Sequence, residues 1–146
     1  VRMKLKHYQG AGIMLIKKAA DGYSVLLGKR KYNPGKGKWS VPGGEKETYE
    51  SDLLSCAKRD FREELGIRAE DVVKDSKPIV CKIKIPFFFN WQTFIYEIDS
   101  DWTFSFGRVH EFTELKFIPF SELKKYRLAF GVKKEIRKFI KERQEA

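Results

Sequence analysis

The amino-acid sequence predicts an α+β domain in which a mixed β-sheet lies between helices. Three observations lead to this prediction. Apolar runs rich in β-branched and aromatic residues recur along the chain, two segments have helical periodicity, and strands and helices do not alternate as regular βαβ units. The 146 residues are the length of one domain, and 42% hydrophobic residues are enough for a core. We therefore expect residues 1–146 to form a single domain.

Two apolar runs near the beginning of the chain, residues 12–16 and 23–27, predict a β-hairpin, because Asp21 and Gly22 between them favour a turn. A loop follows at residues 33–37, which combine Asn, Pro and Gly. Further β-rich runs predict strands at residues 79–85, 93–98 and 115–118.

Residues 51–65 predict a helix, because apolar side chains recur every four positions from Leu53 to Leu65. Ser51 is the expected N-cap, and Gly66 is placed where a left-handed C-terminal cap ends a helix. A short helical turn is expected from residue 121, and residues 131–143 predict a final amphipathic helix. Helices on both faces of the sheet would cover its apolar strands.

Composition excludes several classes of protein. Two cysteines, Cys56 and Cys81, are too few for a disulfide-rich scaffold or a four-cysteine zinc site, and two histidines exclude a histidine-rich metal site. No stretch approaches the ~20 apolar residues of a membrane span, and the first residues lack the apolar segment of a signal peptide. We therefore expect a soluble cytoplasmic protein without membrane partners.

The formal net charge of +10 is unevenly distributed. Residues 1–48 carry eleven Lys and Arg against three acidic residues, residues 49–115 carry nine against thirteen, and residues 116–146 carry ten against four. An acidic centre between basic flanks suits a metal site that attracts a polyanion. A solvated basic surface with a lysine-rich terminal helix explains the same numbers equally well.

The middle helix carries three acidic residues, Asp60, Glu63 and Glu64, on one face, since helical residues follow each other at ~100°. Like charges so close would destabilise an isolated helix by a few tenths of a kcal/mol per pair. A cluster of carboxylate oxygens suits Mg²⁺ or Mn²⁺, which bridge to substrate phosphates. The alternative is an exposed acidic face that neighbouring Lys and Arg side chains relieve.

The loop before this helix favours the metal site. Residues 37–44 end in Pro-Gly-Gly and lead into Glu45, Glu47 and Glu50. The pair Gly43-Gly44 lets the backbone approach a ligand closely and direct a carbonyl oxygen at a metal. Pro-Gly-Gly alone indicates only a turn, but this turn followed by glutamates, an acidic helix face and a terminal glycine is a combination that chance seldom produces.

This combination resembles the Nudix hydrolase family, whose signature is G-x5-E-x7-R-E-U-x-E-E-x-G-U, where U is a bulky apolar residue. Residues 59–67 match its second half at every fixed position except Asp60, where the family has Glu. Eight residues instead of seven separate Glu50 from Arg59, so either Glu50 or Glu47 could take the place of the first glutamate. The resemblance runs from about residue 10 to residue 140 and implies a Nudix-type α/β/α sandwich.

The resemblance also implies an activity, the Mg²⁺-dependent hydrolysis of a pyrophosphate bond in a nucleoside diphosphate derivative, with Mn²⁺ as an alternative metal. Arg59 would orient the acidic residues. Glu111 is our first candidate for the general base, before Glu114 and His110, although an ordinary loop glutamate is equally compatible. The implied metal ligands are Asp60, Glu63, Glu64, Glu111 and the Gly43 carbonyl oxygen.

The substrate is less well determined. An aromatic run at residues 87–91 could stack on a base or simply pack in a core, and the basic residues at 29–31 could meet phosphates or remain solvated. The candidates for substrate contacts are Lys29, Arg30, Trp39 and Phe89. A small-molecule nucleotide is the expected partner of a monomer or homodimer. A nucleotide-binding module with weakened catalysis and an enzyme acting on RNA 5′ ends remain as alternatives.

Overall fold

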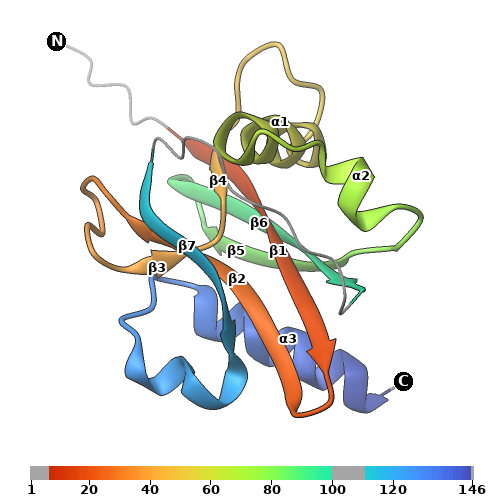
Figure 1. Ribbon diagram of the computed structural model, residues 1–146. Coiled ribbons are helices and arrows are strands. Elements are labelled where there is room, and N and C mark those ends of the chain that lie inside the picture. Colours follow the sequence, from red (N-terminus) through yellow and green to blue (C-terminus); the bar gives the residue numbers. More distant parts are fainter. Residues whose placement is uncertain (1–6, 100–110, 146) are drawn as a thin grey trace, which may run out of the picture.

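The computed structural model describes residues 7–99 and 111–145 and contains the predicted mixed sheet between helices (Figure 1). In this part of the chain seven strands are connected in the order β3-β2-β1-β6-β5, with β4 paired to β1 and β7 paired to β2. Only the pair β1 and β6 is parallel. The strands are β1 (Tyr8–Ala19), β2 (Gly22–Arg30), β3 (Trp39–Ser40), β4 (Gly43–Glu45), β5 (Ile79–Ile85), β6 (Phe89–Ile98) and β7 (Phe112–Pro119).

Strand β1 pairs with two strands, β2 and β4, along one edge. The close approach of β4 explains why β1 contains two glycines. Its C-terminal half forms the predicted hairpin with β2, and its N-terminal half pairs with β4. A Cβ atom on Gly10 would lie 2.7 Å from the Gly44 carbonyl oxygen, and one on Gly12 would lie 2.7 Å from the Pro42 carbonyl oxygen. Glycine at both positions therefore lets the loop that contains β4 lie directly against β1.

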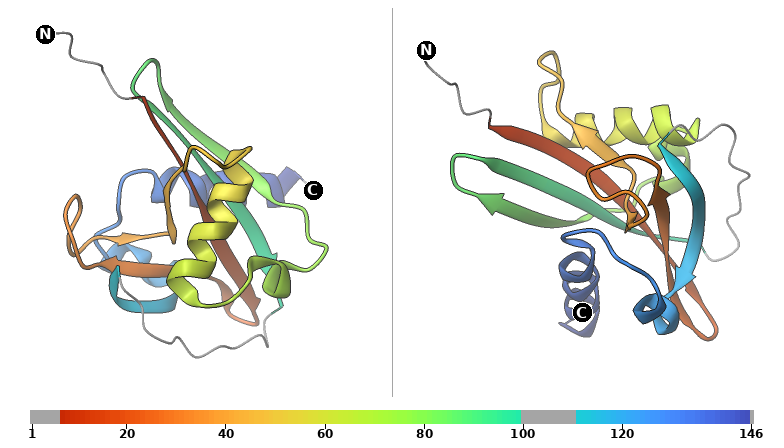
Figure 2. Two further views of the ribbon diagram at one scale, coloured as in Figure 1. Left: turned by 90° about the horizontal axis from the view of Figure 1, so that it is seen from above. Right: turned by 90° about the vertical axis from the view of Figure 1, so that its left-hand side faces the viewer.

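Helices cover both faces of the sheet, as predicted (Figures 1 and 2). One face carries α1 (Leu53–Leu65) and α2 (Ala69–Val73), and the other carries η1 (Phe120–Lys125) and α3 (Val132–Glu145). Alternating residues of β1 supply both cores, since Ile13 and Leu15 pack in the cluster with α1 while Met14 and Ile16 pack in the cluster with α3. The centre of the sheet is therefore buried on both sides. None of the described helices is long and apolar enough to cross a membrane.

The ends of α1 correct one prediction and confirm another. The helix begins at Leu53, and its N-cap is Asp52 instead of Ser51, because the Asp52 carboxylate accepts a hydrogen bond from the Ser55 backbone N–H. Gly66 adopts the left-handed conformation with φ 71° and donates its N–H to the Arg62 carbonyl oxygen. The C-terminal cap is thus the predicted one.

Other element boundaries differ from the predictions mainly in length. The strand at 79–85 is confirmed, but β6 and β7 are longer than expected, and the final helix is Val132–Glu145. The short strands β3 and β4 and the five-residue helix α2 were not predicted. Segments of two to five residues are too short to show a periodicity, and for β4 and β3 the pairing with β1 and β2 decides the conformation.

Candidate active site

The first acidic residue of the helix face, Asp60, lies against the diglycine strand β4. A Cβ atom on Gly44 would be 3.0 Å from Asp60 Oδ1, so the missing side chain is what admits this carboxyl group. One helical turn earlier, the Cys56 thiol donates a hydrogen bond to the Gly44 carbonyl oxygen, with 3.4 Å between sulfur and oxygen. Helix α1 therefore holds β4 through two side chains that the helical repeat places together.

Arg59 connects the helix to the segment that precedes it. Its Nε donates to Glu50 Oε2 at 3.1 Å and its Nη2 donates to Glu50 Oε1 at 3.2 Å. Its Nη2 also donates to the Glu45 carbonyl oxygen at 2.9 Å, and its Nη1 donates to Glu63 Oε2 at 3.0 Å. Burial alone would raise the pKa of Glu50, but the hydrogen bonds from Arg59 and from the Glu47 backbone N–H lower it overall. Glu50 is therefore a buried anion paired with Arg59.

The contact between Arg59 and Glu50 distinguishes Glu50 from Glu47, the two candidates for the first glutamate of the signature. Glu50 is buried and bound to Arg59, whereas the Glu47 side chain is exposed. Before the helix, the chain forms a turn with a hydrogen bond from the Glu50 N–H to the Glu47 carbonyl oxygen. Glu50, not Glu47, occupies the inward position.

Asp60 and Glu64 form a buried acidic pair, one helical turn apart on the inner face of α1. Asp60 Oδ2 and both Glu64 oxygens have no hydrogen-bond donor among the described residues. Burial raises the pKa of both carboxyl groups, and the charges of Asp60 and Glu111 raise that of Glu64 further. Ionised carboxylates only accept hydrogen bonds. Two carboxyl groups in contact are therefore stable when one of them is protonated or when a cation lies between them. A positive charge bound at this pair would stabilise both carboxylates.

The third acidic residue of the helix behaves differently. Glu63 is 60% exposed and pairs with Arg59, whose Nη1 lies 3.0 Å from Glu63 Oε2 and 3.6 Å from Asp60 Oδ1. Glu111 lies close enough to Glu64 and Asp60 to affect their pKa values. Within residues 7–99 and 111–145, no three acidic, histidine or cysteine side chains are arranged as a ligand set as they stand. The predicted trio is therefore divided between a buried pair, with Glu111 beside it, and Glu63 on Arg59.

The start of β7 places Glu111. The Lys31 backbone N–H donates to the Glu111 carbonyl oxygen at 2.8 Å, so the end of β2 holds this residue next to α1. Glu114, the second candidate base, lies 3.8 Å from the Lys116 ammonium group, and the main charges that act on the pKa values of the buried pair come from other residues. The third candidate, His110, lies outside the described residues.

The four candidates for substrate contacts are spread over the three strands β2, β3 and β6. Arg30 is half-buried and donates from Nε to the Pro34 carbonyl oxygen at 2.7 Å. Lys29 is adjacent to Trp39 in the pairing of β2 with β3. Trp39 itself is buried in the cluster with α3 and makes an edge contact with the Tyr126 ring. Trp39 is therefore a core residue in this structure.

The aromatic residue that approaches the site is Trp91 instead of Phe89. Phe89 stacks on Tyr8 with 5.4 Å between ring centroids. The Trp91 ring lies over three glycines, since Cβ atoms on Gly10, Gly12 and Gly43 would be 2.9, 3.1 and 2.9 Å from it. The indole N–H donates to Thr93 Oγ1 at 2.7 Å, which fixes the ring. The sequence identified the aromatic run, but only the parallel register of β1 with β6 selects Trp91.

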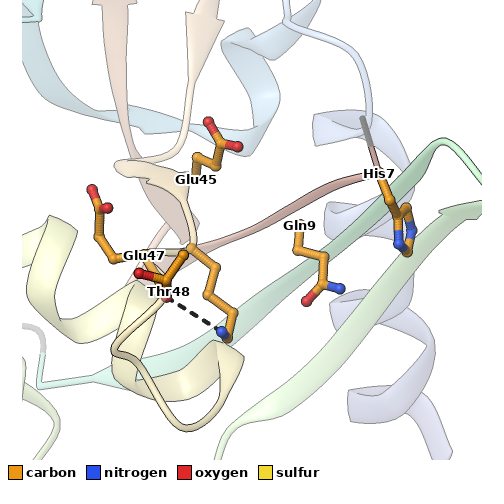
Figure 3. Close-up of a pocket in the computed structure, with 6 residues that line it drawn as sticks. His7, Gln9, Glu45, Glu47 and Thr48 are labelled. Carbon is orange, nitrogen blue, oxygen red and sulfur yellow. Dashed lines mark hydrogen bonds between the residues drawn. The ribbon is translucent and has the colours of Figure 1, made fainter. Parts of the chain in front are cut away.

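A pocket of about 240 Å³ opens next to the diglycine strand (Figure 3). Glu45 and Lys46 border it from the β4 side and Gln9 borders it from β1, while Lys46 Nζ donates to the Glu47 carbonyl oxygen at 3.3 Å. Because the Glu45 carbonyl oxygen accepts from Arg59, this pocket adjoins the acidic site. Its lining residues are His7, Gln9, Glu45, Lys46, Glu47 and Thr48.

The family of the chain follows from its sequence as a whole. The model of the NUDIX domain matches residues 6–142, and the chain belongs to this family. The match confirms the resemblance of residues 59–67 to the Nudix signature, and with it the expected enzyme class, a Nudix pyrophosphohydrolase. No curated protein matched the sequence.

Solved structures confirm the Nudix fold. A Nudix hydrolase from M. smegmatis, RenU, has a TM-score of 0.70 at 21% identity, over 92% of this chain and 86% of that one. An Ap4A hydrolase from C. elegans has a TM-score of 0.70 at 19% identity, over 95% and 99%. A bifunctional NMN adenylyltransferase/ADP ribose pyrophosphatase from Francisella tularensis, complexed with AMP and a Mn ion, has a TM-score of 0.80 at 17% identity, over 95% and 42%.

Proposed function

We propose that this protein hydrolyses a pyrophosphate bond in a nucleoside diphosphate derivative with the help of a divalent metal ion. The observation that carries the proposal is the buried pair Asp60 and Glu64, in which Asp60 Oδ2 and both Glu64 oxygens lack hydrogen-bond donors among the described residues. Burial is the main cause that raises the pKa of both groups, and neighbouring negative charges add to it; a bound cation would favour their ionised forms. A purely structural helix would not retain two buried carboxyl groups when three of their four oxygens have no hydrogen-bond donor among the described residues.

The donor set fits Mg²⁺, since it consists of hard oxygen atoms. Asp60, Glu64, Glu111 and the Gly43 carbonyl oxygen would hold the metal, and Glu63 would join them after leaving Arg59. Mn²⁺ accepts the same ligands, and a Mn ion is present in the structure of the Francisella tularensis relative. The bound metal would neutralise diphosphate charge and favour the ionisation of water.

The remaining chemistry belongs to side chains of this chain. Glu111 would accept the proton of the attacking water, because it faces the buried pair from the start of β7. Arg59 keeps Glu50 ionised and holds Glu63 ready beside the site. Lys29 and Arg30 would meet the outer phosphates at the end of β2. A small-molecule nucleotide is the simplest substrate with these charges, as with the AMP and ADP ribose that two structural relatives bind.

The test compares Glu64→Gln with Glu114→Gln, which removes an exposed carboxylate from β7. Both variants and the wild type are assayed with Mg²⁺ or Mn²⁺ on ADP-ribose, Ap4A and nucleoside triphosphates, and Mn²⁺ binding is titrated separately. We expect Glu64→Gln to lose both activity and Mn²⁺ affinity while Glu114→Gln keeps both. Wild-type protein without turnover, or Glu64→Gln with unchanged turnover, would contradict the proposal.

A second candidate is a nucleotide-binding module with weakened catalysis. Asp60 favours it, because a side chain one methylene shorter than Glu reaches less far toward a metal, and the acidic residues are not gathered as they stand. The variant Asp60→Glu separates the two functions. Hydrolysis that appears only in this variant, together with tight nucleotide binding by the wild type, would identify the binding module.

A further inference from the structure

The hairpin of β5 and β6 carries a surface that the proposed hydrolysis does not use. Strand β5 lies at the end of the strand order and pairs only with β6 among the described strands. Figure 2 shows this hairpin extending beyond the other strands of the sheet. Phe87, at the tip, is 84% exposed, and Phe88 is exposed beside it. Large apolar side chains this exposed on a folded domain mark a site of interaction.

A second segment adds to this surface at the beginning of α3. Phe130 is 79% exposed, and the following residue, Gly131, lies against Ile83 of β5, since its Cβ would be 2.5 Å from Ile83 Cδ1. Lys134 donates from Nζ to the Lys82 carbonyl oxygen at 3.3 Å. The start of α3 therefore lies along the free edge of β5.

The charges of this surface are all positive. Lys82 and Lys84 are exposed on alternate positions of β5, and neither residues 79–96 nor residues 123–134 contain an acidic residue. We call the group the edge surface. It consists of Lys82 and Lys84 on the face of β5 opposite to α3, Phe87 and Phe88 at the tip of the hairpin, and Phe130 and Lys134 on the α3 side of the same edge.

A second copy of this chain is a poor occupant. Pairing two β5 edges would place lysines of one copy opposite lysines of the other, and like charges across strands are destabilising. The Lys134 hydrogen bond also occupies one backbone carbonyl of β5 that such pairing would use. An anionic ligand with flat apolar groups fits both the lysines and the exposed rings.

We propose that the edge surface binds single-stranded RNA. Phosphates would pair with the lysines and unpaired bases would stack on the phenylalanines, as in single-strand binding proteins. The proposal rests on the proposed function, since an RNA 5′ end carries the phosphoanhydride bonds that the acidic site would cleave.

The edge surface is connected to that site across the sheet. Lys84 is paired with Asn90, and Asn90 is paired with Gln9 of β1. Gln9 borders the pocket beside β4, and its carbonyl oxygen accepts from the Lys46 backbone N–H at 2.7 Å. This row of polar side chains provides a path from the hairpin to the diglycine strand, beside which Asp60 lies.

The experiment measures fluorescence anisotropy of an unstructured 12-nucleotide RNA with a 5′-triphosphate and a 3′-fluorophore, over a range of salt concentrations. All proteins carry Glu64→Gln to prevent turnover. The test variants are K82E/K84E and F87A/F88A. The control is K18E/K124E, which makes the same change in charge at exposed lysines of β1 and η1.

We expect K82E/K84E to weaken binding about tenfold or more at 0.1 M salt and to reduce the slope of log Kd against log salt by about 1 to 1.5. F87A/F88A should weaken binding about five- to thirtyfold with an unchanged slope, because it removes stacking. K18E/K124E should change binding less than about threefold. Hydrolysis of small nucleotides, measured without Glu64→Gln, should be the same in all three double variants.

Three results would overturn the proposal. The first is equal loss of RNA binding in K82E/K84E and in the control. The second is absence of RNA binding together with binding to phosphatidylcholine vesicles containing phosphatidylserine, which would assign the surface to membranes. The third is absence of RNA binding with a dimer that F87A/F88A dissociates. Failure of the proposed function is distinguishable, because it would appear as unchanged turnover in Glu64→Gln while RNA binding persists.

Discussion

Arg59 binds both carboxylate oxygens of Glu50, at 3.1 and 3.2 Å, and thereby joins the acidic helix to the loop before it. The two charges are largely shielded from water, and the same guanidinium group also holds the Glu45 carbonyl oxygen of β4. A bidentate pair of this kind orients both partners. Glu50, which lies outside the helix, therefore helps to orient the Arg59 side chain that holds β4 beside the helix.

Replacing Glu50 by Gln should destabilise the protein by about 3 kcal/mol, because it removes the buried carboxylate that binds Arg59 through two oxygens. Urea unfolding at pH 7 measures the change. The variant Glu47→Gln is the matched control, since the Glu47 side chain is exposed and only its backbone takes part. Equal stability of the two variants would show that the pair contributes little.

Replacing the two glycines of β4 by Ala should have different consequences. A Cβ on Gly43 would meet the Ala11 carbonyl oxygen at 2.5 Å and the Gly12 Cα at 2.7 Å, both parts of the backbone. Gly43→Ala should therefore disrupt the pairing of β4 with β1 and lower the thermal midpoint. Gly44→Ala should keep the fold but weaken Mn²⁺ binding, since its nearest neighbour is the Asp60 carboxyl group at 3.0 Å.

Thermal denaturation and Mn²⁺ titration of both glycine variants separate these effects. The prediction fails if Gly44→Ala lowers the thermal midpoint as much as Gly43→Ala does, or if it leaves Mn²⁺ affinity unchanged.

Trp91 should affect metal binding although its side chain offers no ligand. Its ring packs on Gly43 and is held by Thr93, so Trp91→Ala should loosen β4 and lower Mn²⁺ affinity about tenfold, the size seen for supporting residues around metal sites. Trp91→Phe should retain more of the affinity because a ring remains. Phe120→Ala, which removes an aromatic side chain packed against the cluster beside α3, is the control and should lower stability alone.

The buried Glu135 of α3 should make stability depend on pH. Burial raises the pKa of Glu135 from the ordinary value of a glutamate to about 8, and its Oε2 has no hydrogen-bond partner among the described residues. Its ionisable neighbour is the Cys81 thiol, whose pKa burial and the charge of Glu135 raise. Because the folded protein holds the proton more tightly than the unfolded chain, stability should fall as pH rises from about 4.5 to 8.

Urea unfolding at pH 5 and pH 8 checks this expectation in the wild type and in Glu135→Gln. The wild type should have a larger free energy of unfolding at pH 5 than at pH 8. In the variant, the free energies of unfolding at the two pH values should differ less. A difference of the same size in the variant would assign the pH dependence to the acidic pair on α1.

The repeating elements could be predicted from the sequence because their signals are local. The apolar repeat from Leu53 to Leu65 and the position of Gly66 set the helix and its C-terminal cap, and the turn at Asp21 and Gly22 set the hairpin. The N-cap was predicted one residue too early, since Ser51 and Asp52 are both good caps and only the geometry of the preceding turn chooses between them.

The amino-acid sequence by itself thus determined the family, the order of the main elements and the helix that carries the acidic residues. Only the tertiary structure decided that Glu50 and not Glu47 pairs with Arg59, that Glu63 is exposed on Arg59 while Asp60 and Glu64 are buried, and that Trp91 covers Gly43. The physical reason is that periodicity and turn residues act between neighbours along the chain. The partner of a charged or aromatic side chain depends instead on segments that strand pairing brings together from distant parts of the sequence.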